Sequence, residues 1–364
     1  MASLTESVGR VEVIMKPTAV DLFCGAGGLT QGLRQAGFNV VGALEIDKDA
    51  ADVFRLNHPK TKLIEKDITE VSVDEAIKYW GIEKGKLDLL AGCPPCQGFS
   101  TIGTRNRKAA TDDPRNELIF QMLRFIEEIL PKTIMLENVP ALAKDARLQK
   151  FCNRLTDLGY DYDYKVLDVQ RFNVPQRRKR MILLASRERN VVVHDVDLTE
   201  DSPKTVRMTF KKLESSFLSN DSLSALHAQH SEHVMNIIRA IPHDGGSRCD
   251  LPDNLVLKCH KRVSGFRDVY GRMSWDLPSP TITCGCNNPS KGRFIHPEED
   301  RAISLREAAS LQTFPFSYKF PALKGSQKIS RMIGNALPPK FIEFHARCIK
   351  GILSVRSLDE NNER

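Results

Sequence analysis

The stretch Thr18–Gly28, TAVDLFCGAGG, decides how the rest of the chain is interpreted. Its first part, Thr18–Phe23, is a short apolar run typical of a buried strand. The glycines that follow let the backbone turn sharply and pass close to a ligand. Gly28–Ala36 then has the composition of a helix, and Gly37 suits the position just after its end. This order of elements predicts a ligand-binding strand–turn–helix unit.

Further strand-like and helix-like segments alternate through the first half of the chain. The helix-like segment Glu117–Leu130 spaces its apolar residues along one face. Strands are predicted for four more apolar runs, which are Phe38–Leu44, Leu87–Ala91, Thr133–Leu136 and Arg180–Ala185. Alternating strands and helices predict an α/β fold, with a mostly parallel sheet and helices on both of its faces.

Length and composition limit the class of protein. The chain has 364 residues, enough for two domains with cores of their own. Its net charge of +7 fits a polyanionic partner, although many basic proteins bind no nucleic acid. The nine cysteines lack regular spacing, which favours free thiols in a reducing cytoplasm. We expect no secretory leader and no membrane span.

The sequence pattern changes after Ser186. Residues 187–303 are rich in polar residues and turns, so we expect a second, smaller and more irregular domain there. Helical character returns near Leu305, and residues 304–353 are expected to complete the first domain, 1–186. Residues 354–364 are expected to form a flexible tail.

Two carboxylates follow the next two strands, because Glu45 stands at the end of the strand predicted at Phe38–Leu44 and Asp67 comes just after an expected third strand. Glu45 follows Gly25 by 20 residues and can accept hydrogen bonds from both hydroxyls of a ribose. Asp67 can accept a hydrogen bond from the amino group of an adenine. Together they indicate a nucleoside-containing cofactor. A tight turn that merely needs small residues remains an alternative, and a dinucleotide ranks lower because G-x-G-G lacks the later glycine of G-x-G-x-x-G.

The segment Gly92–Ser100, GCPPCQGFS, follows another predicted strand. Its prolines stiffen the loop and hold the Cys96 thiol in one place, as covalent catalysis requires. Cys93 and Cys96 have C-x-x-C spacing, so a zinc half-site or a redox pair is an open alternative, although no second cysteine pair follows at suitable spacing. Glu137 closes the strand at Thr133–Leu136.

Six motifs, in order, resemble those of the C5-cytosine DNA methyltransferase family of bacterial restriction–modification systems. They are DLFCGAGG (21–28), GCPPCQGFS (92–100), ENV (137–139), QRRKR (176–180), SLREAASLQTF (304–314) and IGNALP (333–338). The QRRKR run taken alone could equally be a solvated patch or a phosphate contact. The resemblance implies a Rossmann-like S-adenosylmethionine-dependent methyltransferase sheet with a target-recognition domain over 187–303.

The resemblance also implies the cofactor and the chemistry. S-adenosyl-L-methionine would be held by Phe23, Cys24, Gly25, Gly27, Gly28, Glu45, Ile46, Asp67, Ile68, Pro95, Leu118 and Asn335. The Cys96 thiolate would add to C6 of a cytosine flipped out of the duplex, which makes C5 nucleophilic. Glu137 would stabilise N3 and read the 4-amino group. Arg178 and Arg180 would reach O2 or hold Glu137.

Candidate DNA contacts come from several segments, and these are Gln97, Ser100, Arg105, Arg107, Asn138, Gln176, Thr281 and Thr283. The loop Thr101–Asp113 is predicted to close over the flipped base, the alternative being a merely flexible surface loop. Arg262, Arg267 and Arg272 are candidates for reading guanine edges. His227, His230 and His233 recur in a predicted helical stretch, which we interpret as solvated or facing DNA. No metal is expected.

We therefore expect a monomeric prokaryotic enzyme that methylates a specific double-stranded DNA sequence in the cytoplasm. It would protect host DNA from a cognate restriction nuclease without a stable complex between the two. One alternative is a tRNA cytosine-5 methyltransferase of the same superfamily, but that branch carries a Cys-Phe-Thr element that is missing here. A non-catalytic relative is a second alternative, but such proteins tend to lose the Pro–Cys pair or the glutamate, and both stand here.

Overall fold

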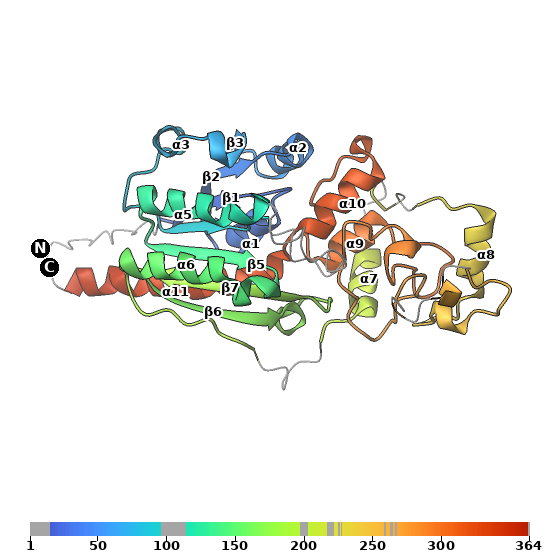
Figure 1. Ribbon diagram of the computed structural model, residues 1–364. Helices are drawn as coiled ribbons and strands as arrows, with labels where there is room; N and C mark the ends of the chain where they lie inside the picture. The colour runs from blue at the N-terminus through green and yellow to red at the C-terminus, as the bar shows by residue number, and fades with distance from the viewer. Residues whose placement is uncertain are drawn as a thin grey trace, which may run out of the picture.

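One mixed sheet organises the larger part of the molecule (Figure 1). The computed structural model describes residues 15–95, 114–196, 203–216, 222–224, 226, 228–257, 260–262, 265 and 268–362. The strands follow the order β3-β2-β1-β4-β5-β7-β6 across the sheet. Their bounds are β1 Thr18–Leu22, β2 Asn39–Glu45, β3 Lys62–Glu65, β4 Leu89–Gly92, β5 Thr133–Asn138, β6 Asp161–Asp168 and β7 Lys179–Ser186.

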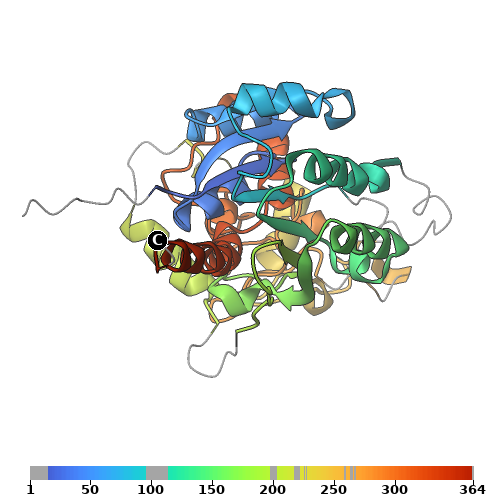
Figure 2. The same cartoon turned by 90° about the vertical axis from the view of Figure 1, so that its left-hand side faces the viewer.

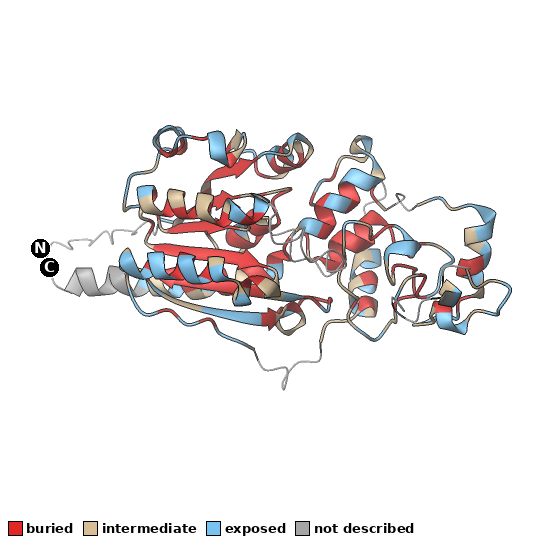
Figure 3. Cartoon of the chain, viewed as in Figure 1, coloured by how far each residue is buried: buried red, intermediate tan, exposed pale blue. Residues whose placement is uncertain are grey.

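The strand directions confirm the predicted, mostly parallel α/β sheet. Strands β1 to β5 pair in parallel, whereas β7 runs antiparallel to both β5 and β6. The strand β6 was not predicted, because its sequence DYDYKVLD carries charges and lacks an apolar run. It lies at the edge of the sheet, where Figure 3 shows it largely exposed beside the buried inner strands.

Side chains alternate between the two faces of the sheet, so each inner strand serves two cores. On β5, Ile134 and Leu136 belong to one core and Met135 to the other. On β4, Leu90 and Leu89 divide in the same way. Burial on both faces explains why these strands appear in the sequence as continuous apolar runs.

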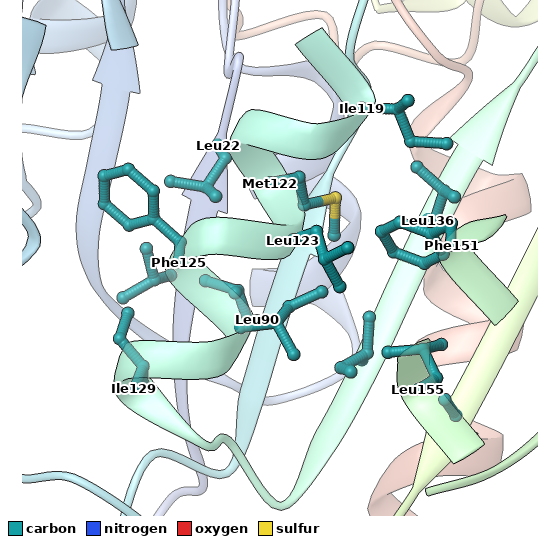
Figure 4. Close-up of a cluster of buried hydrophobic side chains, with 14 of the residues drawn as sticks. Leu22, Leu90, Ile119, Met122, Leu123, Phe125, Ile129, Leu136, Phe151 and Leu155 are labelled. Carbon is teal, nitrogen blue, oxygen red and sulfur yellow. The ribbon is translucent and has the colours of Figure 1, made fainter. Parts of the chain in front are cut away.

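Helices cover both faces of the sheet (Figure 2). One face packs against α3 Val73–Trp80, α5 Leu118–Ile129 and α6 Ala146–Asp157. Figure 4 shows Met122, Phe125 and Ile129 of α5 in this core together with Leu90 of β4. The opposite face packs against α1 Gly28–Gln35 and α11 Pro339–Asn362, while α2 Lys48–Asn57 follows β2.

A further hydrophobic core lies at the right of Figure 1, and we call the region built around it the smaller part of the molecule. It is built from α7 Val206–Ser215, α9 Leu305–Leu311 and α10 Ser326–Asn335, together with irregular segments. Helix α8 Glu232–Ala240 belongs to a small satellite cluster. The predicted domain bounds stay predictions. Among the described residues, α10 packs in this core, whereas the next helix, α11, packs against the sheet.

Candidate active site

A cavity of about 530 Å³ lies where the parallel strands end at their carboxyl termini. All predicted cofactor residues except Gly27 line it, namely Phe23, Cys24, Gly25, Gly28, Glu45, Ile46, Asp67, Ile68, Pro95, Leu118 and Asn335. The predicted catalytic residues Glu137, Arg178 and Arg180 line it as well, as do Asn138, Thr281 and Thr283. The fold therefore brings together residues that are up to 312 positions apart, from Phe23 to Asn335. Their roles remain predictions.

The glycine-rich turn is fastened to the end of β2 through Glu45. One carboxylate oxygen accepts a hydrogen bond from the backbone of Gly25 at 2.7 Å, and the other accepts from Ile46 and Asp47 at 3.0 and 2.7 Å. Burial raises the pKa of Glu45, and the hydrogen bonds partly offset this shift. The oxygen bonded to Gly25 keeps a lone pair for a further donor, such as a ribose hydroxyl.

Phe23 and Ile46 present apolar surface at this cavity. Phe23 adopts a left-handed backbone conformation, with φ of 62°, which a side chain other than glycine rarely takes. Ile46 is 61% exposed although it is a large aliphatic residue. An apolar pair beside the Glu45 carboxylate suits a ligand with an aromatic base and a hydroxylated sugar.

Asp67 follows β3 and begins a short 3₁₀ turn. Its Oδ1 accepts hydrogen bonds from the backbone and the hydroxyl of Thr69, at 2.9 and 2.8 Å. These bonds fix the side chain, which is half-buried at the cavity. The carboxylate is therefore oriented before any ligand arrives.

Gly27 does not line the cavity, but it is required for the shape of the turn. Its φ is 94°, and a Cβ there would lie 2.5 Å from Tyr318 Oη and 2.7 Å from His58 Nε2. Both conditions favour glycine, because an L side chain is strained at that φ and has no room. Gly27 thus lets two buried side chains approach the turn from behind.

These two side chains form a directed chain of hydrogen bonds. Arg34, which can only donate, lies 3.0 Å from His58 Nδ1. The neutral ring must then donate from Nε2 to Tyr318 Oη at 2.9 Å, and the tyrosine donates to the Ala26 carbonyl at 2.5 Å. Burial, followed by the charge of Arg34, lowers the pKa of His58 to about 3, so the ring stays neutral.

Glu137 and Arg180 meet because β7 is antiparallel to β5. Glu137 lies opposite Ile182, and Arg180, two residues along, points to the same face of the sheet. The Arg180 Nε lies 2.9 Å from Glu137 Oε1 as an ion pair, but this oxygen has no hydrogen bond of good geometry among the described residues. On the other side, Cys93 Sγ donates to Glu137 Oε2 at 2.7 Å.

The Glu137 carboxyl group is almost completely buried, with 1% of its surface exposed. Burial raises its pKa above the ordinary value, while the charge of Arg180, the Cys93 hydrogen bond and the charge of Arg178 oppose the rise. A buried carboxyl with a raised pKa can keep its proton closer to neutral pH than an exposed one. It is therefore suited to donate a proton or a hydrogen bond.

Arg178 serves as a junction between distant segments. Its guanidinium donates to the carbonyls of Ile282 at 3.0 Å and Gly334 at 3.1 Å, and it is 4% exposed. Its Nε has no hydrogen-bond partner among the described residues. Arg180, not Arg178, holds Glu137. The prediction left these two roles open, and the structure divides them.

Gln176 is placed differently from its expected contact with DNA. It is completely buried, its amide nitrogen donates to Gln312 at 2.8 Å, and its oxygen accepts from Ile282 at 2.9 Å. Gln312 in turn donates to the carbonyls of Ile333 and Ala336. Because its amide is used inside the protein, Gln176 joins three motifs and presents no polar atom to DNA.

Other predicted contacts have mixed outcomes. Asn138 donates to the Pro94 carbonyl at 3.0 Å and so fastens the start of the loop that leads to Cys96. Thr281 and Thr283 both line the cavity, and Thr281 donates to the Arg177 carbonyl at 2.7 Å. Several predicted residues lie outside the described residues, namely Cys96, Gln97, Ser100, Arg105 and Arg107 with the rest of the loop 101–113.

The interpretation of Arg272 as a reader of guanine is wrong. Its side chain is fully buried and donates to the carbonyls of Ile241, His296, Glu299 and Ile238. It also pairs with Asp300. Arg272 therefore holds the irregular part together from within. Arg267 and the side chain of Arg262 lie outside the described residues.

The predicted histidine helix is also wrong. Helix α8 begins at Glu232, so His230 precedes it and only His233 lies on it, while His227 is outside the described residues. Across the described part of the chain, no group of three His, Cys, Asp or Glu side chains is arranged to hold a metal ion. None of its helices is both long and apolar enough to cross a membrane.

Three residues at the cavity were missed by the sequence analysis. Cys93 contacts Glu137, Cys284 Sγ donates to Asn335 Oδ1 at 2.9 Å, and Arg331 of α10 pairs with Asp47 at 2.7 Å. Cys93 carried a signal, since it stands next to the proline pair, but it was considered only as a metal or redox ligand. Nothing local in the sequence marks the other two.

A second cavity, of about 740 Å³, lies between α7 and α11. Phe172, Phe314 and Phe344 contribute apolar surface to it. None of the residues predicted for the site lines it. The predicted site residues are therefore gathered at the smaller cavity, where the carboxyl ends of the strands converge.

Comparison with known proteins gives a consistent result. The family model described as C-5 cytosine-specific DNA methylase matches residues 18–351. The chain is 37% identical over 351 residues to the type II methylase M.HgiDII of Herpetosiphon aurantiacus, covering 93% of this chain and 96% of that one. It is 30% identical to the type II methyltransferase M1.HphI of Haemophilus parahaemolyticus, covering 92% and 87%.

Among solved structures, the Dnmt2 methyltransferase of S. pombe is similar with a TM-score of 0.65 at 19% identity. The match covers 93% of this chain and 99% of that one. A likeness at this level of identity supports the fold. The fold of the chain is therefore similar to that of this solved structure.

Proposed function

The chain belongs to the C-5 cytosine-specific DNA methylase family, and we propose that it performs this chemistry in the 530 Å³ cavity with Cys96 as nucleophile and Glu137 as acid. It is a DNA (cytosine-5-)-methyltransferase whose cofactor is S-adenosyl-L-methionine. The observation that carries the proposal is the convergence of Glu137, Arg180 and the Pro94–Pro95 segment on one cavity. Cys96 follows Pro95 directly in the chain.

The residues of the cavity fit this cofactor. Glu45 would accept from the ribose hydroxyls, Phe23 and Ile46 would cover the adenine, and Asp67 would take its amino group. Asn335 would face the methionine end. When bound, S-adenosylmethionine supplies an electrophilic methyl group on a sulfonium. An exposed isoleucine beside a prearranged carboxylate in one cavity supports the assignment, because ligand pockets combine apolar surface with a few placed polar groups.

The protein's own groups would activate the base. The Cys96 thiolate adds to C6 of the cytosine, which makes C5 nucleophilic. Glu137 gives a proton or a hydrogen bond to N3 as negative charge develops there, and its raised pKa suits this role. Once C5 carries the methyl group, loss of the C5 proton expels the thiolate.

DNA is the substrate that the relatives favour. The relatives in Herpetosiphon aurantiacus and Haemophilus parahaemolyticus are named as type II enzymes, which supports a DNA target over the tRNA alternative. We propose further that the chain acts as a monomer without metal, in the cytoplasm of a prokaryote. We also propose that it modifies the site of a cognate restriction nuclease without a stable complex. Residues 187–303 would select the sequence.

The test uses duplex DNA and tRNA with labelled S-adenosylmethionine. We expect methyl transfer to duplex DNA and a covalent complex with DNA that contains 5-fluorocytosine. The variant Cys96→Ala should lose both, while Cys348→Ala on α11, away from the cavity, should keep both. Unchanged activity in Cys96→Ala, or transfer to tRNA alone, would contradict the proposal.

A further inference from the structure

Cys93 contacts the carboxyl group that the proposed chemistry depends on. It is the first residue after β4, and its backbone amide donates to the Leu22 carbonyl of β1 at 3.3 Å. The parallel register pairs Gly92 with Leu136, which brings the next residues, Cys93 and Glu137, side by side. The Cys93 Sγ then lies 2.7 Å from Glu137 Oε2. The sheet itself fixes this contact.

The charges around the pair keep the thiol protonated. Burial raises the pKa of Cys93 well above its usual value, the Glu137 carboxylate raises it further, and Asp21 adds to this effect. Arg180 opposes the rise. Arg178 is the remaining charged group that acts on Glu137. A thiol in this setting is a neutral S–H donor, in contrast to the thiolate needed from Cys96.

The two oxygens of Glu137 are therefore not equivalent. Oε2 accepts the Cys93 proton, while Oε1 faces Arg180 and has no well-aligned hydrogen bond among the described residues. Without Cys93, the carboxyl group could rotate and exchange its two oxygens. With Cys93, Oε2 is occupied by the thiol, while Oε1, buried beside Arg180, keeps lone pairs for a further hydrogen bond.

We propose that Cys93 is a positioning residue for the methyltransferase reaction: its thiol holds Glu137 Oε2, so that Oε1 is presented to N3 and the 4-amino group of the cytosine. This inference rests on the proposed function of Glu137. The thiol also biases the protonation of Glu137, because a donor to a carboxylate favours the charged form. Loss of the donor raises the pKa of Glu137 further.

The test compares Cys93→Ala with Cys93→Ser in single-turnover methylation at saturating cofactor and DNA, across a range of pH. In Cys93→Ala, we expect the plateau rate to fall several-fold. The limb of the pH profile that belongs to Glu137 should move to higher pH by up to about one unit. Serine keeps a donor, although a shorter one, so Cys93→Ser should recover part of both effects. Cofactor affinity should not change.

A purely structural role predicts a different result. In that case alanine and serine would lower the rate equally without moving the pH limb, and the proposal would be wrong. It would also be wrong if both variants matched the unmodified enzyme. If neither variant folds, the infrared S–H stretching band of the unmodified enzyme decides. The S–H stretching frequency should differ between the unmodified enzyme and the Glu137→Gln variant. An identical frequency in the two proteins would contradict the contact between Cys93 and Glu137.

The parent proposal has separate controls in the same experiment. Cys96→Ala must be inactive and Glu137→Gln must be slow for the chemistry to hold. If these controls behave as expected while the Cys93 variants show no shift, only the positioning role fails. If Cys96→Ala remains active, the proposed function itself fails.

Discussion

Asp21 is a buried carboxyl group on β1, just before the glycine-rich turn. Its Oδ2 accepts a hydrogen bond from the Thr30 hydroxyl at 2.6 Å, while Oδ1 has no hydrogen-bond partner among the described residues. Burial raises its pKa from 3.8 to about 7, although the bonds from Thr30 oppose the shift. The folded protein therefore binds this proton more tightly than the unfolded chain does.

The raised pKa of Asp21 makes the folded protein less stable as the pH rises. A carboxyl whose folded-state pKa is raised contributes stability in full below about pH 3.8, and this stability is lost as the pH rises through about 7. We predict that Asp21→Asn loses less stability than the unmodified protein between pH 5 and 8, by at most about 3 kcal/mol. Chemical denaturation at several pH values measures this difference.

The exposed residue Asp253 provides the control for this measurement. Asp253→Asn should follow the pH dependence of the unmodified protein. Parallel stability curves for Asp21→Asn and the unmodified protein would mean that Asp21 titrates normally in the fold.

At the scale of elements, the turn between β1 and α1 depends on support from behind. Tyr318 lies 292 residues away from Ala26 in sequence, yet its hydroxyl holds the Ala26 carbonyl. Tyr318 belongs to the core of the smaller part, so residues from both parts of the molecule hold the glycine-rich turn in place. Gly27 is the residue that makes this contact sterically possible.

We predict that Gly27→Ala destabilises the fold by more than about 2 kcal/mol and weakens cofactor binding at least about tenfold. The added Cβ is strained at positive φ and displaces the Tyr318 hydroxyl or the His58 ring. Denaturant unfolding and calorimetric titration with S-adenosylmethionine measure the two effects.

Gly85→Ala is the matched control. Gly85 also has a positive φ, of 77°, but a Cβ there meets nothing within 4 Å. It should cost only the backbone strain of about 1–2 kcal/mol and leave cofactor binding unchanged. Equal effects of the two alanines would show that the packing behind Gly27 is unimportant.

At the scale of the whole molecule, buried amides connect motifs that are distant in sequence. Gln176 bonds to Gln312, and Gln312 bonds to the backbone at Ile333 and Ala336. This junction is where the chain passes between the smaller part and the sheet. A buried amide that loses its partner costs about 1–3 kcal/mol.

We predict a coupling free energy of about 0.5–3 kcal/mol between Gln176→Leu and Gln312→Leu in a double-mutant cycle of unfolding. Gln149 and Asn153 form a similar bond of 2.8 Å on the exposed surface of α6. Their cycle should give a coupling close to zero. A buried cycle without coupling would reject the junction.

The sequence alone determined the α/β sheet, its inner strands and most of the cofactor-side residues at the cavity. Buried parallel strands are continuous apolar runs, and glycine-rich turns have a local backbone requirement, so both can be recognised without the fold. The positions of Glu45, Asp67 and Glu137 at the ends of predicted strands then assigned them to one edge of the sheet. The polar edge strand β6 was not predicted, because its residues form no continuous apolar run.

Only the tertiary structure decided what the buried polar residues do. The burial of Gln176 and Arg272, and the pairing of Glu137 with both Arg180 and Cys93, depend on strand register and on partners far away in the chain. The sequence does not distinguish an arginine or glutamine that contacts DNA from one that forms hydrogen bonds inside the protein. Burial separates these roles, because a buried donor must find its acceptor within the fold.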